Sequence, residues 1–264
     1  MNILTVCIHY PVASGRYITE AFKALGHDAR SMGPMTGTKI WGIDVHPKYI
    51  WHPDYLIDGE KGIEWGGWKP DLVVTAESAM ALKFPPGVPH VCWGMDNHVR
   101  DYQFHDLKFD SMFFCHSWGA RMGEDKVYWA PPCYEPRYCR DLGFERDIDI
   151  GMVAVPYDGR SELVDGMRGA GVEVMFTWGP IYEEYERMYN RIKIALIRSI
   201  HGDVSHRVFE VMAMGCCVLM DKARDMEKIG FIEGSISSNT PTRLTRRRRR
   251  APCSNRASGS VSPN

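Results

Sequence analysis

The chain has 264 residues, of which 44% are hydrophobic and 25% charged, a composition typical of a globular protein with room for about two domains. Its formal net charge of -1 argues against binding to nucleic acid or acidic membranes through overall charge. The charge is unevenly distributed, however. Residues 235–264 contain seven Arg and no acidic residue, so they carry +7 and leave -8 on the other 234 residues.

The sequence shows no signal for export or membrane insertion. Residues 1–9 are apolar but lack the basic segment and cleavage site of a secretory signal sequence. The longest nearly apolar run, residues 211–220, is about half the ~20 residues of a membrane-spanning helix. We therefore expect a cytoplasmic protein. The eight Cys include no C-x-x-C pair, which argues against structural zinc, and Cys115 lies in an apolar run that favours a buried thiol over a nucleophile.

The N-terminal half alternates strand-like apolar runs with helical patterns. Helical spacing of apolar residues predicts a helix over residues 16–25, ended by Gly26, and a second helix over residues 77–82. Predicted strands cover residues 3–8, 71–75, 88–93, 111–115 and 127–129. Such alternation is typical of a parallel sheet covered on both faces.

The same alternation starts again after a Pro-rich stretch at residues 131–136. Predicted strands cover residues 149–155, 172–178, 192–197 and 216–220, and predicted helices cover residues 160–167, 181–190 and 206–214. The sequence therefore predicts an α/β protein with an N-terminal domain over residues 1–140 and a shorter C-terminal domain over residues 147–234. Residues 235–264 are too poor in apolar side chains to form a core, which predicts a basic disordered tail.

The most informative motif is the segment Ser205–Gly215 (SHRVFEVMAMG), followed by an apolar strand that ends at Asp221. The N-terminus of such a helix offers unpaired N–H groups that suit a phosphate. Helical spacing places Arg207 and Glu210 on one face, where they could also form a plain surface ion pair. The chain contains neither G-x-G-x-x-G nor G-x-x-x-x-G-K-[ST], which argues against a dinucleotide oxidoreductase and a P-loop nucleotidase.

The run from Tyr189 to Asp221 (YNRIKIALIRS…DVSHRVFEVMAMGCCVLMD) resembles the C-terminal half of the CgeB-like glycosyltransferases, which are related to the retaining family 4. Shorter matches lie at residues 69–74 (KPDLVV), 89–97 (PHVCWGMDN) and 149–153 (DIGMV), so the resemblance extends over about residues 1–234. It implies a GT-B fold, in which two tandem Rossmann-like domains face each other across a cleft.

The resemblance also implies which residues bind a nucleotide-sugar donor. Glu210 matches the glutamate that accepts hydrogen bonds from the ribose hydroxyls, and Arg160 and Arg207 are the candidate cations for the diphosphate. Ser205 and His206, at the start of the same helix, complete the predicted donor site. One departure stands out: family 4 enzymes often carry a second Glu eight residues before the first, and this chain has Gly202 there, beside Asp203.

Candidate site residues in the N-terminal domain rest on weaker sequence signals. Asp96 and His98 follow a predicted strand and could act as a base or hold the acceptor, although Asp-Asn sequences also form turns. The predicted acceptor-binding residues are His9, Gly15, Trp65 and Trp68. Four Trp between residues 41 and 68 could stack on a sugar, or they could pack under a long loop.

We therefore expect a glycosyltransferase that moves a sugar from a nucleotide-diphosphate donor to a small-molecule, glycan or protein acceptor, without a metal or a bound cofactor. The D-x-D string at residues 147–149 is interpreted as the start of a strand. Two alternatives remain: a non-catalytic sugar- or nucleotide-binding protein and a GT-B sugar-nucleotide epimerase. The Arg246–Arg250 run could be a nucleic-acid patch, but an altered reading frame is the preferred interpretation of the tail, and no nucleic-acid partner is expected.

Overall fold

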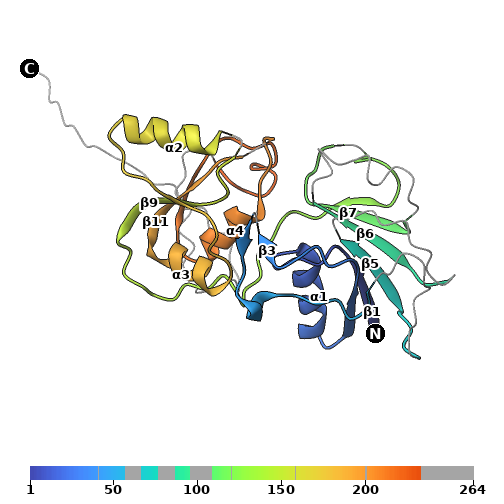
Figure 1. The fold of residues 1–264 in the computed structure, drawn as a ribbon. Coiled ribbons are helices and arrows are strands. Elements are labelled where there is room, and N and C mark those ends of the chain that lie inside the picture. Colours follow the sequence, from blue (N-terminus) through green and yellow to red (C-terminus); the bar gives the residue numbers. More distant parts are fainter. Residues whose placement is uncertain are drawn as a thin grey trace, which may run out of the picture.

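The computed structural model describes residues 1–40, 42–56, 67–76, 87–95, 109–119, 121–157, 159–199 and 201–232. Two parallel β-sheets, each with its own helices, form an N-terminal and a C-terminal unit (Figure 1). The predicted helix over residues 77–82 and the predicted tail lie outside the described residues.

The N-terminal unit is built on six parallel strands in the order β2-β1-β5-β6-β7-β8. Helix α1 (Ser14–Ala24) joins β1 to β2, and Gly26 follows it with a φ of 85°, as predicted for a residue just past a helix end. The strands are β1 (Asn2–Val6), β2 (Asp28–Met32), β5 (Leu72–Ala76), β6 (His90–Gly94), β7 (Ser111–Phe114) and β8 (Val127–Trp129). Strand-like sequence predicted five of these six, with bounds that differ by a few residues.

Alternation along β1 explains the two faces of this sheet. Ile3 packs with Ile18 and Phe22 of α1, whereas Leu4 and Val6 pack on the other face with Trp68. The α1 face and the Trp68 face are both parts of the N-terminal core.

The C-terminal unit has four parallel strands in the order β10-β9-β11-β12. Its strands are β9 (Ile148–Val153), β10 (Met175–Thr177), β11 (Ile192–Ile197) and β12 (Cys217–Met220), and its helices are α2 (Arg160–Gly169), α3 (Glu183–Arg191) and α4 (His206–Ala213). Val164 of α2 packs on one face with Met152 and Leu196. Helices α3 and α4 cover the other face, so this sheet is covered on both sides, as predicted.

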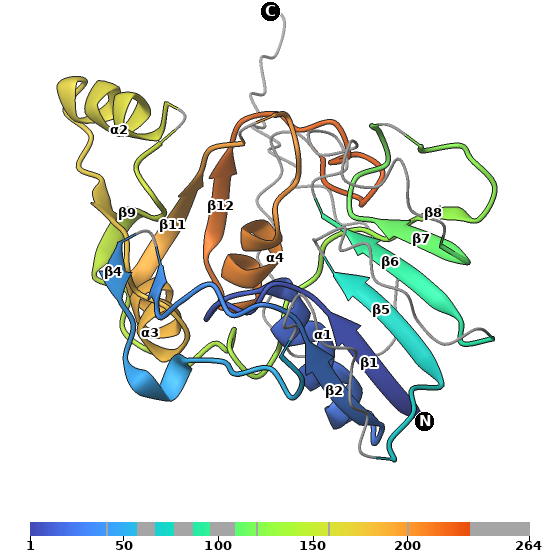
Figure 2. The same cartoon turned by 45° about the vertical axis from the view of Figure 1, so that its right-hand side comes forward.

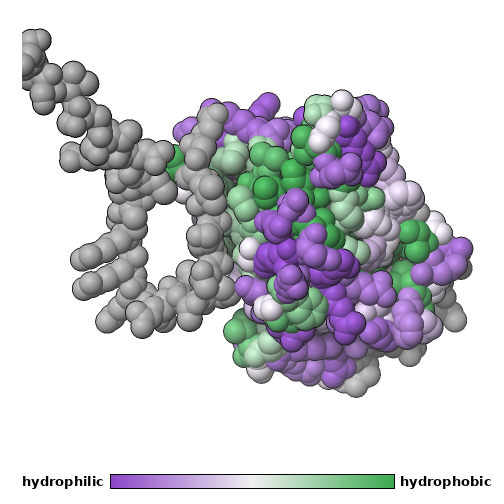
Figure 3. All heavy atoms as spheres, turned by 90° about the vertical axis from the view of Figure 1, so that its left-hand side faces the viewer, coloured by the Kyte–Doolittle hydropathy of each residue, from purple (hydrophilic) through white to green (hydrophobic). Residues whose placement is uncertain are grey.

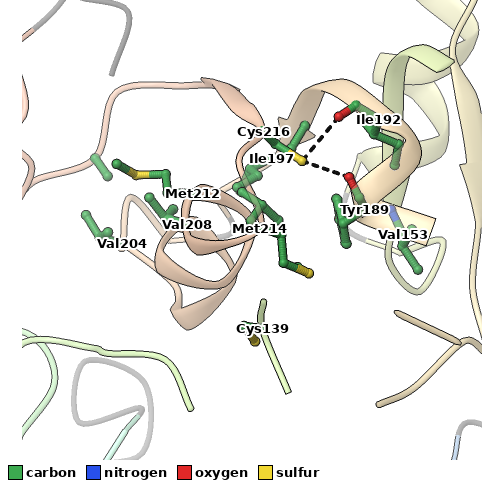
Figure 4. Close-up of a cluster of buried hydrophobic side chains, with 13 residues drawn as sticks. Cys139, Val153, Tyr189, Ile192, Ile197, Val204, Val208, Met212, Met214 and Cys216 are labelled. Atoms are coloured by element: carbon green, nitrogen blue, oxygen red, sulfur yellow. Dashed lines mark hydrogen bonds between the residues drawn. The ribbon is translucent and has the colours of Figure 1, made fainter. Parts of the chain in front are cut away.

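The core beneath α3 and α4 includes polar contacts to the backbone (Figure 4). The Cys216 thiol lies 3.1 Å from the carbonyl oxygen of Tyr189 and 3.4 Å from that of Ile192. The Arg146 guanidinium donates to the same two carbonyls, at 3.1 and 2.6 Å, and to that of Met214 at 2.6 Å. Arg146 therefore satisfies carbonyls at the ends of both helices, and the Tyr189 carbonyl also accepts the Ile192 N–H.

The chain passes from the N-terminal unit to the C-terminal unit before residue 140. Cys139 belongs to the core of the C-terminal unit. Arg140 donates to the carboxylate of Glu186, and the Leu142 N–H donates to Asn190. The segment just before β9 is thus packed against α3 and belongs structurally with the C-terminal sheet.

A short excursion of the N-terminal unit reaches the C-terminal unit. Residues 39–49, called the arm below, comprise the antiparallel pair β3 (Lys39–Ile40) and β4 (Ile43–Asp44) and a 3-10 turn (Pro47–Tyr49). The arm lies beside the start of α3 (Figure 2). The Tyr49 ring stacks on Tyr182 with a centroid distance of 4.9 Å, and its hydroxyl donates to Glu183.

No helix in the described part of the chain is long and apolar enough to cross a membrane. The outer side of the C-terminal unit shows an apolar area among hydrophilic residues (Figure 3). Exposed apolar side chains of this unit include Phe144 and Leu219, and single exposed residues of this kind are common on globular proteins.

Candidate functional site

The start of α4 faces the N-terminal unit. His206, the first residue of the helix, places its Nδ1 2.9 Å from the Cys133 carbonyl oxygen and its Nε2 4.0 Å from the Cys115 sulfur. Cys115 directly follows β7 and is buried, in agreement with the interpretation as a buried thiol. The predicted donor helix therefore begins at the contact between the two units.

Two polar groups at this helix start are shielded from water and have no hydrogen-bond partner: the Ser205 hydroxyl and the Nε of Arg207. Ser205 occupies the N-cap position, yet its side chain does not cap the helix. A buried polar group without a partner costs about 1–3 kcal/mol. A polar ligand that satisfied these groups would recover part of that cost.

Glu210 lies one turn further along α4 and is held by α3. The Tyr185 hydroxyl donates to Glu210 Oε2 at 2.8 Å. Burial lowers the pKa of Arg207, but Tyr185, Tyr189 and Glu210 outweigh that effect and hold it above its ordinary value, so the guanidinium is charged. Glu210 is thus hydrogen-bonded to a tyrosine and also interacts electrostatically with Arg207.

Arg160 faces inward at the start of α2. Only 5% of the residue is exposed, its guanidinium lies 4.4 Å from the centroid of the Tyr157 ring, and it donates to the Val155 carbonyl at 3.1 Å. Its Nε is shielded without a partner. The structure therefore shows Arg160 supporting the loop between β9 and α2, at the carboxyl end of β9.

The position of the missing second glutamate is a turn. Gly202 has a φ of 74°, a conformation that favours glycine, and the Asp203 carboxylate accepts a hydrogen bond from Ser199 at 3.2 Å.

The D-x-D string at residues 147–149 forms ion pairs at the start of β9: Asp147 with Arg191 and Asp149 with Lys193. Its interpretation as the start of a strand is confirmed.

His9 follows β1 and is fully buried. Its ring stacks on Trp51 at a centroid distance of 4.0 Å, its Nδ1 lies 3.1 Å from the Cys7 carbonyl oxygen, and its Nε2 has no partner. Burial lowers the pKa of His9 to about 4, so the ring is neutral in the folded protein.

This environment predicts acid sensitivity. The unfolded chain binds a proton at His9 below about pH 6.5, whereas the folded chain does so only near pH 4. The free energy of unfolding should therefore fall as the pH drops from 6.5 to 4, by up to about 3 kcal/mol from this residue. Urea unfolding measures the free energy of unfolding at each pH. In His9→Phe its slope against pH should be smaller by the contribution of one proton, whereas His52→Gln, the matched variant of an exposed histidine, should keep the wild-type slope. Equal slopes in wild type and His9→Phe would contradict the assignment.

Gly15 has a structural reason to be glycine. A Cβ at this position would lie 2.2 Å from the Cys7 sulfur and 2.6 Å from the Cys7 Cβ, because α1 begins directly against the end of β1. Close packing of helix on strand therefore accounts for Gly15 without an acceptor.

We expect Gly15→Ala to lower the free energy of unfolding by about 1–3 kcal/mol, the usual cost of overpacking. The Cys7→Ala background removes the sulfur and should reduce that loss. Gly166→Ala is the control, because a Cβ in that part of α2 meets nothing within 4 Å. Chemical denaturation checks all three, and equal effects of Gly15→Ala and Gly166→Ala would refute the packing explanation.

Trp68 is a core residue. It is 8% exposed, packs with Leu4 and Val73 on the sheet face opposite α1, and donates its indole N–H to Asp28 at 2.8 Å. The structure thus favours the aromatic-packing interpretation over acceptor binding for Trp68. The other N-terminal candidates, Asp96, His98 and Trp65, lie outside the described residues.

Sequence reasoning missed the tyrosine that joins the units. Tyr182 lies at the start of α3, and its hydroxyl donates to the Pro11 carbonyl of the N-terminal unit. Arg16 of α1 lies 4.8 Å from the centroid of the Tyr182 ring. The Tyr-rich composition of α3 was visible in the sequence, but its partners come from other parts of the chain.

Comparisons with known proteins agree with this geometry. Residues 168–235 match the family model described as Glycosyl transferase-like, a segment that contains α3, β11, α4 and β12. No curated protein matches the chain by sequence.

Several solved structures are similar at 11% sequence identity. An α-glucosyltransferase in complex with UDP and a 13-mer DNA has a TM-score of 0.56, covering 83% of this chain and 79% of that chain. Sucrose-phosphate synthase from Thermosynechococcus elongatus has a TM-score of 0.53, with coverage of 86% and 83%. A glycosyltransferase involved in Avilamycin A biosynthesis has a TM-score of 0.53, with coverage of 86% and 80%. The chain therefore has the GT-B glycosyltransferase fold, as predicted.

Proposed function

We propose that this protein is a nucleotide-sugar-dependent glycosyltransferase of the CgeB-like type. The observation that carries the proposal is helix α4, which begins at the contact between the two units with Arg207 charged and Glu210 hydrogen-bonded to Tyr185. This helix lies within the segment that matches the glycosyltransferase family model. The epimerase alternative has no observation in its favour.

In this proposal the donor binds to the C-terminal unit. The Glu210 carboxylate accepts hydrogen bonds from the ribose hydroxyls. Arg207 and the first turn of α4, with Ser205 and His206, face the diphosphate, because a charged guanidinium and unpaired N–H groups stabilise a developing negative charge. Arg160 is the second cation, supplied from the loop after β9.

The acceptor, a small molecule, glycan or protein, binds to the N-terminal unit, and Asp96 or His98 acts as the base if one is needed. The diphosphate charge is carried by cations and a helix terminus, so we propose a metal-independent reaction in the cytoplasm. Transfer that persists in excess chelator is the expected result, and loss of transfer that added Mg²⁺ or Mn²⁺ restores would contradict this part.

A non-catalytic nucleotide-binding protein is the second candidate, and Gly202 favours it. The second glutamate of family 4 enzymes is absent there, and the backbone is a left-handed turn. Conversion of a labelled nucleotide sugar separates the candidates, because a binding protein would leave it intact.

Isothermal calorimetry with UDP and GDP tests the proposal most simply. We expect one of the two to bind wild type. The isolated 5′-phosphate of ribose is the control for general anion binding, since it lacks the base and the diphosphate. Absence of binding by both nucleotides would overturn the proposed function.

A further inference from the structure

At the contact between α3 and α4, a tyrosine hydroxyl is hydrogen-bonded to a carboxylate, an arrangement that packing alone does not require. Tyr185 is half-buried, and its ring meets Tyr189 edge-to-face with a centroid distance of 4.8 Å. Its hydroxyl is directed at one oxygen of Glu210, at 2.8 Å. The two rings come from successive turns of the same helix, and it is the Tyr185 hydroxyl that donates to Glu210 of α4 and also faces the Arg207 guanidinium. The Tyr189 hydroxyl accepts the Val153 N–H at 3.2 Å instead.

The hydroxyl of Tyr185 is a fixed donor. Burial, followed by the charge of Glu210, raises the pKa of Tyr185 well above its ordinary value, so the phenol keeps its proton across the working pH range. A carboxylate has about four lone-pair positions and one phenol occupies one of them. The hydrogen bond therefore fixes the rotation of the carboxylate and leaves acceptor capacity for further donors.

We propose that Tyr185 is a positioning residue that orients the Glu210 carboxylate toward the two ribose hydroxyls of the donor, and thereby sets the preference for a ribonucleotide. The inference rests on the proposed function and assigns a role there to a residue of α3. Two hydroxyls on one ribose demand a defined plane of the carboxylate, because both hydrogen bonds are directional. Without Tyr185, the Glu210 side chain would sample other rotamers, and less of the binding would depend on the ribose hydroxyls.

The readout is a ratio of affinities rather than an affinity. For the nucleoside diphosphate that binds wild type, UDP or GDP, calorimetry gives the dissociation constant of that compound and of its 2′,3′-dideoxy form. In wild type the dideoxy form should bind at least about tenfold more weakly, since hydrogen bonds to a charged group are strong. Tyr185→Phe should reduce that ratio by about threefold to tenfold, the worth of one ordinary hydrogen bond.

Tyr189→Phe is the matched control. It removes a hydroxyl that lies near Arg207 but does not donate to Glu210, and it breaks a hydrogen bond in the same core, so it reports what loss of a neighbouring tyrosine hydroxyl does to binding. Melting temperatures of both variants confirm that the folded protein is compared. The ratio should stay at the wild-type value in Tyr189→Phe.

The outcomes separate the inference from the proposed function. A wild-type ratio that Tyr185→Phe leaves unchanged, or that Tyr189→Phe lowers equally, would overturn the positioning role while nucleotide binding stands. Failure of wild type to bind either nucleotide would overturn the proposed function and this inference with it. A lowered ratio in Tyr185→Phe alone supports both.

Discussion

Replacement of Glu210 by Ala should weaken nucleoside diphosphate binding by about 10- to 100-fold. The reason is that a charged acceptor for ribose hydroxyls contributes about 1.5–3 kcal/mol, and each 1.4 kcal/mol corresponds to a tenfold change in the dissociation constant. The measurement is calorimetry at constant pH and salt with the nucleotide that binds wild type. The loss should appear in the affinity for UDP or GDP and be much smaller for the dideoxy form, which has no ribose hydroxyls to offer.

Two variants control for indirect effects of Glu210→Ala. Glu210→Gln keeps an oxygen that can accept from Tyr185, so it tests the charge with little change in packing. Glu227→Ala removes an exposed carboxylate elsewhere in the C-terminal unit and should leave the affinity unchanged. An unchanged affinity in Glu210→Ala would contradict the ribose assignment, whatever the melting temperature does.

Arg146→Met should cause the largest loss of stability, about 3 kcal/mol. The guanidinium donates to the carbonyls of Tyr189, Ile192 and Met214, and methionine offers none of these donors while it fills similar space. The estimate is less than the sum for three carbonyls, because the Cys216 thiol also contacts two of them. For a chain of this size the loss corresponds to roughly 6–12 °C in melting temperature.

Urea denaturation followed by circular dichroism measures this loss. Arg187→Met is the control, because Arg187 is an exposed residue of α3 and its replacement leaves these carbonyls satisfied. A free energy of unfolding that falls equally in both variants would show that Arg146 contributes only a general surface charge.

The strands that the sequence predicted are those whose apolar residues form continuous runs. Residues 192–197 (IKIALI) form a central strand, and the apolar run predicted it with the correct bounds. Strand β2 (DARSM) was missed because it lies at the sheet edge, where Asp28 is exposed and Arg30 partly so. The arm was missed for another reason: its two-residue strands are too short to show a periodic pattern. Its contacts are with the C-terminal unit, which is distant in the sequence.

The site was predictable to the extent that it depends on one helix. Helical spacing placed Arg207 and Glu210 on a common face, and the structure keeps both near α3. The bond from Tyr185 to Glu210 was not predictable, because it depends on how α3 packs against α4 across 25 residues of sequence. Gly15 and Trp68 show the reverse case. Their residue types suit a binding site, yet close packing at the end of β1 and burial against Leu4 explain them.

The central claim is that the C-terminal unit binds a nucleotide sugar through α4, and a thermal-shift panel of nucleotide sugars tests it most directly. A ligand at 100 times its dissociation constant adds about 2.7 kcal/mol to the free energy of unfolding, which for this chain length is roughly 5–11 °C. We predict that at least one UDP- or GDP-sugar produces such a shift in wild type and a clearly smaller one in Glu210→Ala. A panel in which no nucleotide sugar shifts wild type, or in which the shift is equal in Glu210→Ala, would contradict it.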